Sequence, residues 1–135
     1  MQVDFRMIFA VDATFKLYRP VGKAELELIR ESGFTRYPPR LAGQPIFYPV
    51  LSEEYAREIA EKWNANDPQS GYVGYVTVFH LRMEFASLFP AKQAGDVHHR
   101  ELWIPAERIE VFNRNIVGPI EVIAEFGGST PAGAK

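Results

Sequence analysis

Short apolar runs separated by turn-forming residues dominate this chain, and several of them are rich in Val, Ile, Phe and Tyr, which favour β-strands. We therefore expect strands at residues 5–9, 15–18, 46–50, 72–81 and 116–126. A further short strand opens at Glu101. The run at 72–81 carries apolar side chains on both faces, which predicts a central position in a sheet.

Three other stretches have the apolar spacing and end signals of helices. The first covers residues 23–31, and Gly33 provides a left-handed stop. The second covers residues 53–63 and begins after Ser52, a good N-cap. The third lies between the last two strands, where Pro105 suits the first helical position.

The remaining segments are irregular. Residues 34–45 contain three prolines and one glycine, which predicts a constrained loop. Residues 82–89 fit either a strand or a helix, and we favour an irregular strand extension. Strands thus dominate, with about three short helices, which predicts an α+β domain on a mixed, largely antiparallel sheet. We assign residues 1–128 to this single domain and 129–135 to a flexible tail.

Composition narrows the class of protein. The 135 residues are 47% hydrophobic and 13% aromatic, enough for one packed core. The net charge is −2, with basic and acidic residues interspersed, so we expect neither a nucleic-acid nor a membrane partner. No apolar run is long enough for a bilayer span or a signal-peptide core, which favours a cytoplasmic protein. The absence of cysteine excludes disulfides, thiol catalysis and Cys-zinc sites.

Glu101 is the main candidate for chemistry because it directly precedes the apolar run Leu-Trp-Ile. Such a carboxylate is either an exposed strand end or an acid held in a cleft, where its charge acts on a ligand. His99 shares a strand face with Glu101, so it could line the same cleft as a polar contact or proton carrier. His98 and His99 point to opposite faces, and His80 adds no ligand spacing, so we expect no metal site.

Three groups of residues occur in the same order in a known family. They are Leu17-Tyr18-Arg19; Gln44-Pro45-Ile46-Phe47-Tyr48-Pro49-Val50 with Tyr55-Ala56; and Glu101-Leu102-Trp103-Ile104-Pro105 with Phe112-Asn113 and Ile116-Val117-Gly118. In these groups the chain, over residues 15–126, resembles small bacterial proteins labelled ADP-ribosylation/crystallin J1-like, which share the ADP-ribosyltransferase fold. The resemblance implies an ADP-ribosyltransferase-like split sheet with NAD held in a cleft between its two halves.

The resemblance also implies roles for individual residues. ADP-ribosyltransferases use an Arg or His on the first core strand, a Tyr or Ser on a later strand and a Glu opening a strand near the C-terminus. These positions match Arg19, Tyr48 and Glu101, with Phe47 second if the register differs by one residue. Tyr55 falls where such folds place an aromatic ring over the nicotinamide. With NAD as substrate, Glu101 would stabilise the oxocarbenium-like ribose and Arg19 would hold a phosphate or ribose oxygen.

Two residues of the expected cleft, Pro20 and His99, depart from the family pattern. Active members have Gly after the Arg or His, and its backbone binds the carboxamide, whereas Pro20 has no N–H. Arginine-modifying members have Gln or Glu in place of His99. Two hypotheses follow: a NAD-dependent enzyme that transfers or hydrolyses ADP-ribose, and a non-catalytic ligand-binding or protein-interaction module that retains the fold. Either is compatible with a homodimer through exposed aromatic residues at 85–89 or Tyr37.

Overall fold

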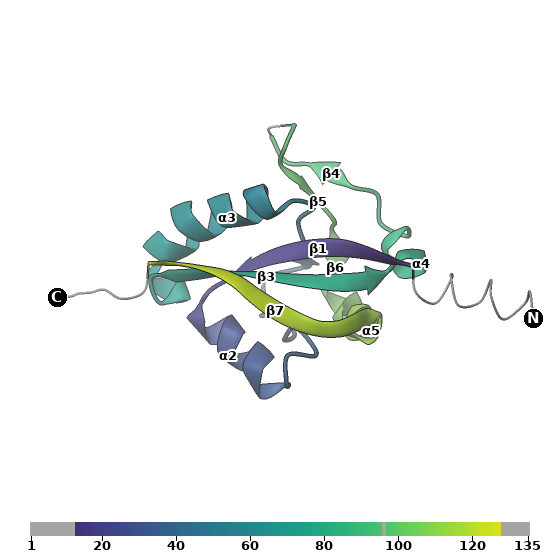
Figure 1. Cartoon of the computed structure of the whole chain (residues 1–135), viewed down its shortest axis with the longest axis horizontal. Coiled ribbons are helices and arrows are strands. Elements are labelled where there is room, and N and C mark those ends of the chain that lie inside the picture. Colours follow the sequence, from purple (N-terminus) through teal and green to yellow (C-terminus); the bar gives the residue numbers. More distant parts are fainter. Residues whose placement is uncertain (1–12, 96, 128–135) are drawn as a thin grey trace, which may run out of the picture.

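The computed structural model describes residues 13–95 and 97–127, so the strand expected at 5–9 and the tail expected at 129–135 lie outside the described residues. Its framework is a three-stranded antiparallel sheet in the order β1–β3–β7, formed by Thr14–Val21, Val73–Arg82 and Ile116–Gly127 (Figure 1). The central position predicted for β3 is confirmed. All strand pairs of the described residues are antiparallel, so the parallel pairing that a mixed sheet requires is not found there.

Helices cover both faces of this sheet, with α3 on one side and α2 and α5 on the other (Figure 1). The described α-helices are α2 (Lys23–Glu31), α3 (Glu53–Lys62), α4 (Met83–Ala86) and α5 (Ile109–Arg114). The 3-10 turns are η1 (Asn64–Asn66), η2 (Pro68–Ser70) and η3 (Ala106–Arg108). The short strands are β2 (Ile46–Phe47), β4 (Lys92–Gln93), β5 (Arg100–Glu101) and β6 (Ile104–Pro105). The α+β class is therefore confirmed.

Local sequence signals set the helix ends as expected. The Ser52 hydroxyl accepts the backbone N–H of Tyr55 at 3.1 Å and so caps α3. Gly33 has a φ of +77°, and its N–H bonds the carbonyl of Arg30 while the N–H of Phe34 bonds that of Ile29, which is a Schellman end to α2.

The irregular strand extension expected at 82–89 is wrong, because β3 ends at Arg82 and one turn of helix, α4, follows. Phe85 and Ala86 are adjacent and both buried in the core. Neighbouring strand residues would face opposite sides of the sheet, whereas a helical turn lets both pack inward. The described residues therefore hold four α-helices, not about three. Pro105 also differs, since it ends β6 and precedes η3.

One extended segment pair shapes the edge of the molecule. Ile46 pairs with Pro105 and Phe47 with Ile104, and the same register returns where Val50 pairs with Glu101. Residues 46–51 and 100–105 therefore form one antiparallel ladder that is interrupted in its middle. Val50 also pairs with Tyr18 of β1, which places this ladder beside the central sheet.

The core consists of two clusters. The larger one includes Tyr37, Phe47, Phe79 and Phe112, whose rings meet at tilted and edge-on angles with centroids 5.0 to 6.4 Å apart. The smaller one packs α3 against β3 through Val50, Tyr55, Ala56, Ala60 and Val76. Among the described residues, no helix has the length and apolarity needed to cross a membrane.

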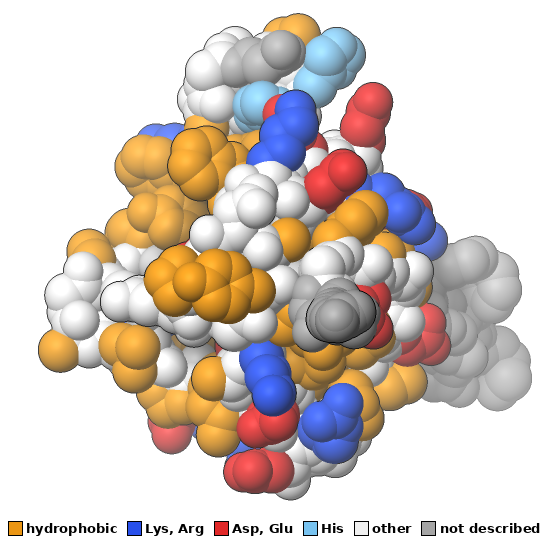
Figure 2. Space-filling model, turned by 90° about the vertical axis from the view of Figure 1, so that its left-hand side faces the viewer, with side chains coloured by type: hydrophobic (Ala, Val, Ile, Leu, Met, Phe, Trp, Pro, Cys, Tyr) orange, Lys and Arg blue, Asp and Glu red, His pale blue; other side chains and the backbone are white. Residues whose placement is uncertain are grey.

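Surface hydrophobic residues gather partly at the end of α3. Figure 2 views the end of the molecule where α3 finishes and β3 begins, and it shows hydrophobic side chains exposed among charged ones. Trp63 is 70% exposed and Tyr72 is 57% exposed. By contrast, Tyr37 and Phe85, which we expected in an exposed aromatic interface, are 1% and 5% exposed and belong to the core.

Candidate functional site

A cleft of about 360 Å³ lies at the outer edge of β1. Four residues singled out from the sequence line it: Arg19, Pro20, Tyr48 and Glu101. Four others complete its wall: Val50, Ile59, Asn64 and Trp103. The volume falls in the range of small-molecule sites. The fold therefore brings the opening strand and the segment around Glu101 to one cavity.

Pro20 explains why the strands part here. The backbone N–H and carbonyl of Tyr18 both bond the backbone of Val50, at 3.0 and 2.8 Å. The backbone polar groups of Tyr18 therefore point to the outer edge of β1, away from β3. The backbone of Pro20, two residues later, points to the same edge. If the pairing of Tyr18 with Val50 continued, Pro20 would lie opposite Tyr48. Proline has no N–H to continue the ladder. β1 and the Tyr48 segment are therefore free to diverge, and the cleft opens between them.

Glu101 is a buried carboxylate, 8% exposed, and two donors hold it. The hydroxyl of Tyr55 donates to Oε2 at 2.8 Å, and the indole N–H of Trp103 donates to Oε1 at 2.8 Å. Charge-assisted hydrogen bonds of this kind stabilise an ionised acid in a partly apolar wall. A carboxylate has about four lone-pair sites, so Glu101 can still accept hydrogen bonds from a ligand.

Arg19 is also buried, 8% exposed, and its partner is Glu25 of α2. The guanidinium donates to both Glu25 oxygens, at 2.7 and 3.0 Å, and lies 4.5 Å from the centre of the Phe47 ring. Burial lowers the pKa of Arg19, but the charge and hydrogen bonds of Glu25 outweigh this and raise the pKa above its ordinary value. A third, longer contact of 3.5 Å runs from Nη1 to the carbonyl of Tyr48.

These contacts give the cleft a negative character. Arg19 and Glu25 neutralise each other in one bidentate ion pair. Arg19 therefore does not balance the negative charge of Glu101. Two aromatic rings, Tyr48 and Trp103, meet edge-on beside it with centroids 6.1 Å apart. The Lys92 ammonium already lies 5.5 Å from the centre of the Trp103 ring. Aromatic faces next to a carboxylate attract organic cations.

Tyr55 and His99, the other two residues expected at the site, do not line the cleft. The hydroxyl of Tyr55 contacts Glu101 from α3. His99 stacks flat on the Tyr55 ring, with centroids 4.3 Å apart, and its Nε2 lies 2.9 Å from Oε1 of Glu58. That hydrogen bond lowers the pKa of Glu58. The histidine thus supports Tyr55 from outside, near the β4–β5 connection where Figure 2 shows histidine side chains.

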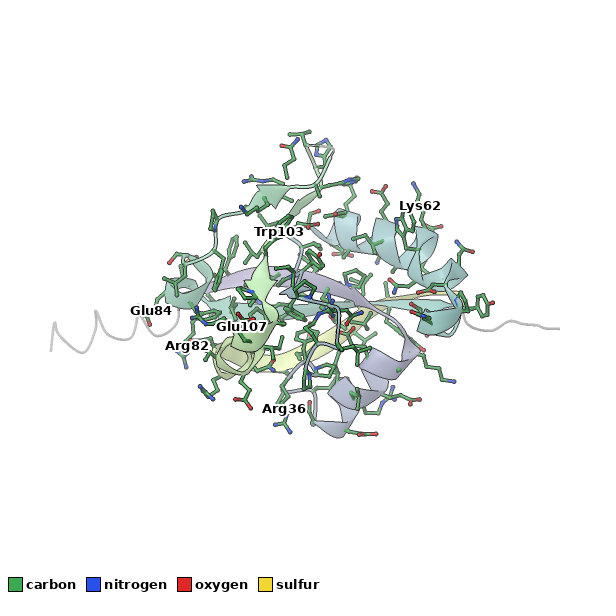
Figure 3. The ribbon with its side chains drawn as sticks, turned by 180° about the vertical axis from the view of Figure 1, so that it is seen from behind. Arg36, Lys62, Arg82, Glu84, Trp103 and Glu107 are labelled. Atoms are coloured by element: carbon green, nitrogen blue, oxygen red, sulfur yellow. The ribbon has the colours of Figure 1, made fainter. Side chains whose placement is uncertain are left out.

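Trp103, Asn64 and Glu25 were not singled out from the sequence. Trp103 has a readable signal, because it stands two residues after Glu101 and so can share its strand face. Figure 3 labels Trp103 between the β4–β5 pair and β6. Asn64 follows α3 in a polar turn, and Glu25 has the position of an ordinary first-turn acid, so neither has a local pattern that marks it.

The described residues contain no group of three or more His, Asp or Glu side chains placed to hold a metal ion. Comparisons with protein-family models, curated proteins and solved structures found no match for this chain. The family resemblance consequently depends on the sequence motifs alone. What the geometry itself defines is an α+β protein with an acidic, aromatic-walled cleft beside its first described strand.

Proposed function

We propose that the chain has the fold of the ADP-ribosyltransferases and that its cleft binds the nicotinamide end of NAD or of a closely related nucleotide. One observation carries this proposal: Arg19 and Glu101, matched separately to the family motif, line a single cavity together with Tyr48. The charge of the cleft supports it as well. The oxidised nicotinamide ring is a flat cation, which suits a negative site with aromatic walls.

Glu101 would act on the bond between nicotinamide and ribose. As this C–N bond breaks, its electron pair leaves with the ring nitrogen, and nicotinamide departs neutral. The ribose carbon becomes an oxocarbenium-like cation, which the fixed carboxylate stabilises while its free lone pairs accept ribose hydroxyls. The oxygen of water, or of an acceptor hydroxyl, then bonds the carbon and releases its proton to solvent. Hydrolysis and transfer differ only in that last reactant.

Arg19 would serve as a fixed donor in this scheme. Glu25 neutralises its charge and occupies Nε and one proton of Nη2, so a free cation for the diphosphate is not offered. Protons on Nη1 and Nη2 are left for neutral oxygens of the ribose. The resemblance had implied a phosphate or ribose oxygen, and the pairing with Glu25 favours the ribose.

The test measures release of nicotinamide by chromatography and binding of NAD by tryptophan fluorescence. The chain has two tryptophans, and Trp63 is replaced by Phe so that the fluorescence comes from Trp103 in the cleft. We expect NAD to change this fluorescence and Glu101→Gln to abolish release. Glu107→Gln is the matched control, since Glu107 is exposed and does not line the cleft. A chain that neither releases nicotinamide nor responds to NAD does not have this function.

A second candidate is a non-catalytic module that binds a small organic cation. The observation that favours it is the Lys92 ammonium beside Trp103, a cation already in place against the cleft wall. A tetraalkylammonium ion is the suitable probe. Saturable quenching of Trp103 by that ion, with no response to NAD, would support the module in place of the enzyme.

A further inference from the structure

We propose that Asn64 is a binding residue of the cleft and that its Oδ1 accepts a hydrogen bond from the carboxamide N–H of the nicotinamide. This inference rests on the proposed function and adds a residue that determines which ring is bound. Asn64 lines the same cavity as Pro20 and Glu101. It opens the turn η1, and one residue, Trp63, separates it from the end of α3.

The hydrogen bonds around Asn64 fix the orientation of its amide. Nδ2 lies 3.0 Å from the Ser70 hydroxyl, and that hydroxyl lies 3.1 Å from Oδ2 of Asp67. The aspartate only accepts, so the single proton of Ser70 is donated to it. Ser70 then has no proton for Asn64, and the amide must present its NH₂ group to Ser70. Oδ1 is left pointing elsewhere.

Oδ1 of Asn64 is unpartnered. Among the side-chain nitrogen and oxygen atoms of residues 13–95 and 97–127, it is the one that is buried and has no hydrogen-bond partner. Buried polar atoms are nearly always bonded, and leaving one unbonded costs about 1–3 kcal/mol. An unbonded acceptor in a residue that lines a cavity is suited to a donor that the ligand supplies.

The turn that bonds Asn64 packs closely against the end of β1, where a second acceptor lies. Ser70 packs against Gly22, where an added Cβ would lie 2.7 Å from Ser70 Cα, so η2 is pressed onto the end of β1. Pro20, at that end of β1, has no N–H and directs its carbonyl to the outer edge of the strand. Pro20 and Asn64 together therefore offer acceptors to a ligand, and an amide NH₂ group is the complement.

Binding requires a small movement of the cleft wall, because Oδ1 is closed to water in this structure. Satisfying the buried oxygen opposes the cost of that movement. Only a ligand with a hydrogen-bond donor next to Oδ1 of Asn64 gains this stabilisation. A ring of the same shape and charge without an N–H leaves the oxygen unbonded and receives no such compensation.

The experiment compares NAD with 3-acetylpyridine adenine dinucleotide, in which a methyl ketone replaces the carboxamide and the ring charge is kept. Affinities are measured from Trp103 fluorescence in the Trp63→Phe protein. We expect the wild-type cleft to bind NAD about tenfold more tightly than the analogue, the equivalent of about 1.4 kcal/mol. In Asn64→Leu, affinity for NAD should fall to that of the analogue, whose own affinity should change little.

Two further variants make the result specific to the Asn64 oxygen. Asn64→Asp keeps an acceptor of the same size and should retain the preference for NAD. Asn66→Leu removes an exposed amide outside the cleft, bonded only to the Lys62 carbonyl, and should leave both affinities unchanged. Equal binding of the two dinucleotides by wild type, with no selective effect of Asn64→Leu, overturns the role of Asn64 alone. No binding of either dinucleotide by wild type overturns the proposed function and this inference together.

Discussion

The Tyr55 hydroxyl donates a 2.8 Å hydrogen bond to the carboxylate of Glu101, which ties α3 to the strand that carries the acid of the cleft. Both residues are buried, at 9% and 8% exposed. The tyrosine therefore positions a charged group that lies far from it in the sequence. His99 stacked on the outer face of its ring limits movement of that ring.

Tyr55→Phe should destabilise the protein by about 1–3 kcal/mol, because a buried carboxylate loses one of its two donors while the packing is kept. Urea denaturation followed by circular dichroism measures this. Tyr72→Phe is the matched control: Tyr72 is 57% exposed, and its free energy of unfolding should change by less than about 0.5 kcal/mol. Equal effects of the two substitutions would show that the bond to Glu101 contributes nothing.

The protein should lose stability in alkali through its buried tyrosines. Burial raises the pKa of both Tyr37 and Tyr55 above the ordinary value of 10.0, and the hydrogen bond to Glu101 adds to the rise for Tyr55. In the unfolded chain these phenols release protons at lower pH than in the folded one. Their contribution is therefore complete below pH 10.0 and declines as the pH rises above it.

Urea midpoints across this range, with phenolate absorbance as a second signal, test the alkaline loss. Tyr37→Phe should make the decline with pH less steep, because one of the shifted groups is gone. The same substitution also removes the 2.8 Å bond to Thr77, so it should lower stability at neutral pH as well. A decline as steep as in the wild type would mean that Tyr37 ionises equally in both states.

The chain offers a matched comparison of a buried and an exposed Arg–Glu pair. Arg19–Glu25 and Arg57–Glu53 have nearly equal Nε–Oε2 distances, 2.7 and 2.8 Å, but the arginine side chains are 9% and 45% exposed. Glu25→Gln leaves a buried charge without its counter-ion and should cost about 3 kcal/mol. Glu53→Gln should cost less than about 0.5 kcal/mol. Thermal and urea unfolding of both variants measure the difference, and equal losses would contradict the role of burial.

Much of the fold could be predicted because its determinants are local. The cap at Ser52 and the left-handed Gly33 define the start of α3 and the end of α2 through bonds within a few residues. The central position of β3 could likewise be predicted from its own residues, because apolar side chains occur on both faces of the strand. By contrast, α4 is a single turn fixed by the burial of Phe85, a tertiary effect that the apolar pattern of 82–89 does not express.

The site was predictable only in part for the same reason. Arg19, Tyr48 and Glu101 were found through motifs, and the structure brings them to one cavity. The partner of Arg19 could not be found, because Glu25 reaches it only after α2 has folded back beside β1. The unpartnered oxygen of Asn64 is likewise a property of packing around Ser70 and leaves no trace in composition or spacing.

Gly74 should be the least replaceable glycine for the packing of α3. A Cβ at Gly74 would lie 2.8 Å from Ala60 Cα and closer still to the Ala60 carbonyl oxygen, and both are backbone atoms that cannot rotate away. Gly74→Ala must push α3 from β3 and should cost about 3 kcal/mol. Under the proposed function it should also weaken the binding of NAD, since α3 carries Tyr55, which holds Glu101.

Gly43→Ala separates this steric effect from backbone strain. Gly43 has a φ of +83°, yet a Cβ there meets nothing within 4 Å, so the substitution should cost only about 1 kcal/mol and leave the cleft unaffected. Urea unfolding and Trp103 fluorescence measure both variants. If Gly74→Ala were no more destabilising than Gly43→Ala, α3 would have room to shift, and the contact with Ala60 would not hold Glu101 in place.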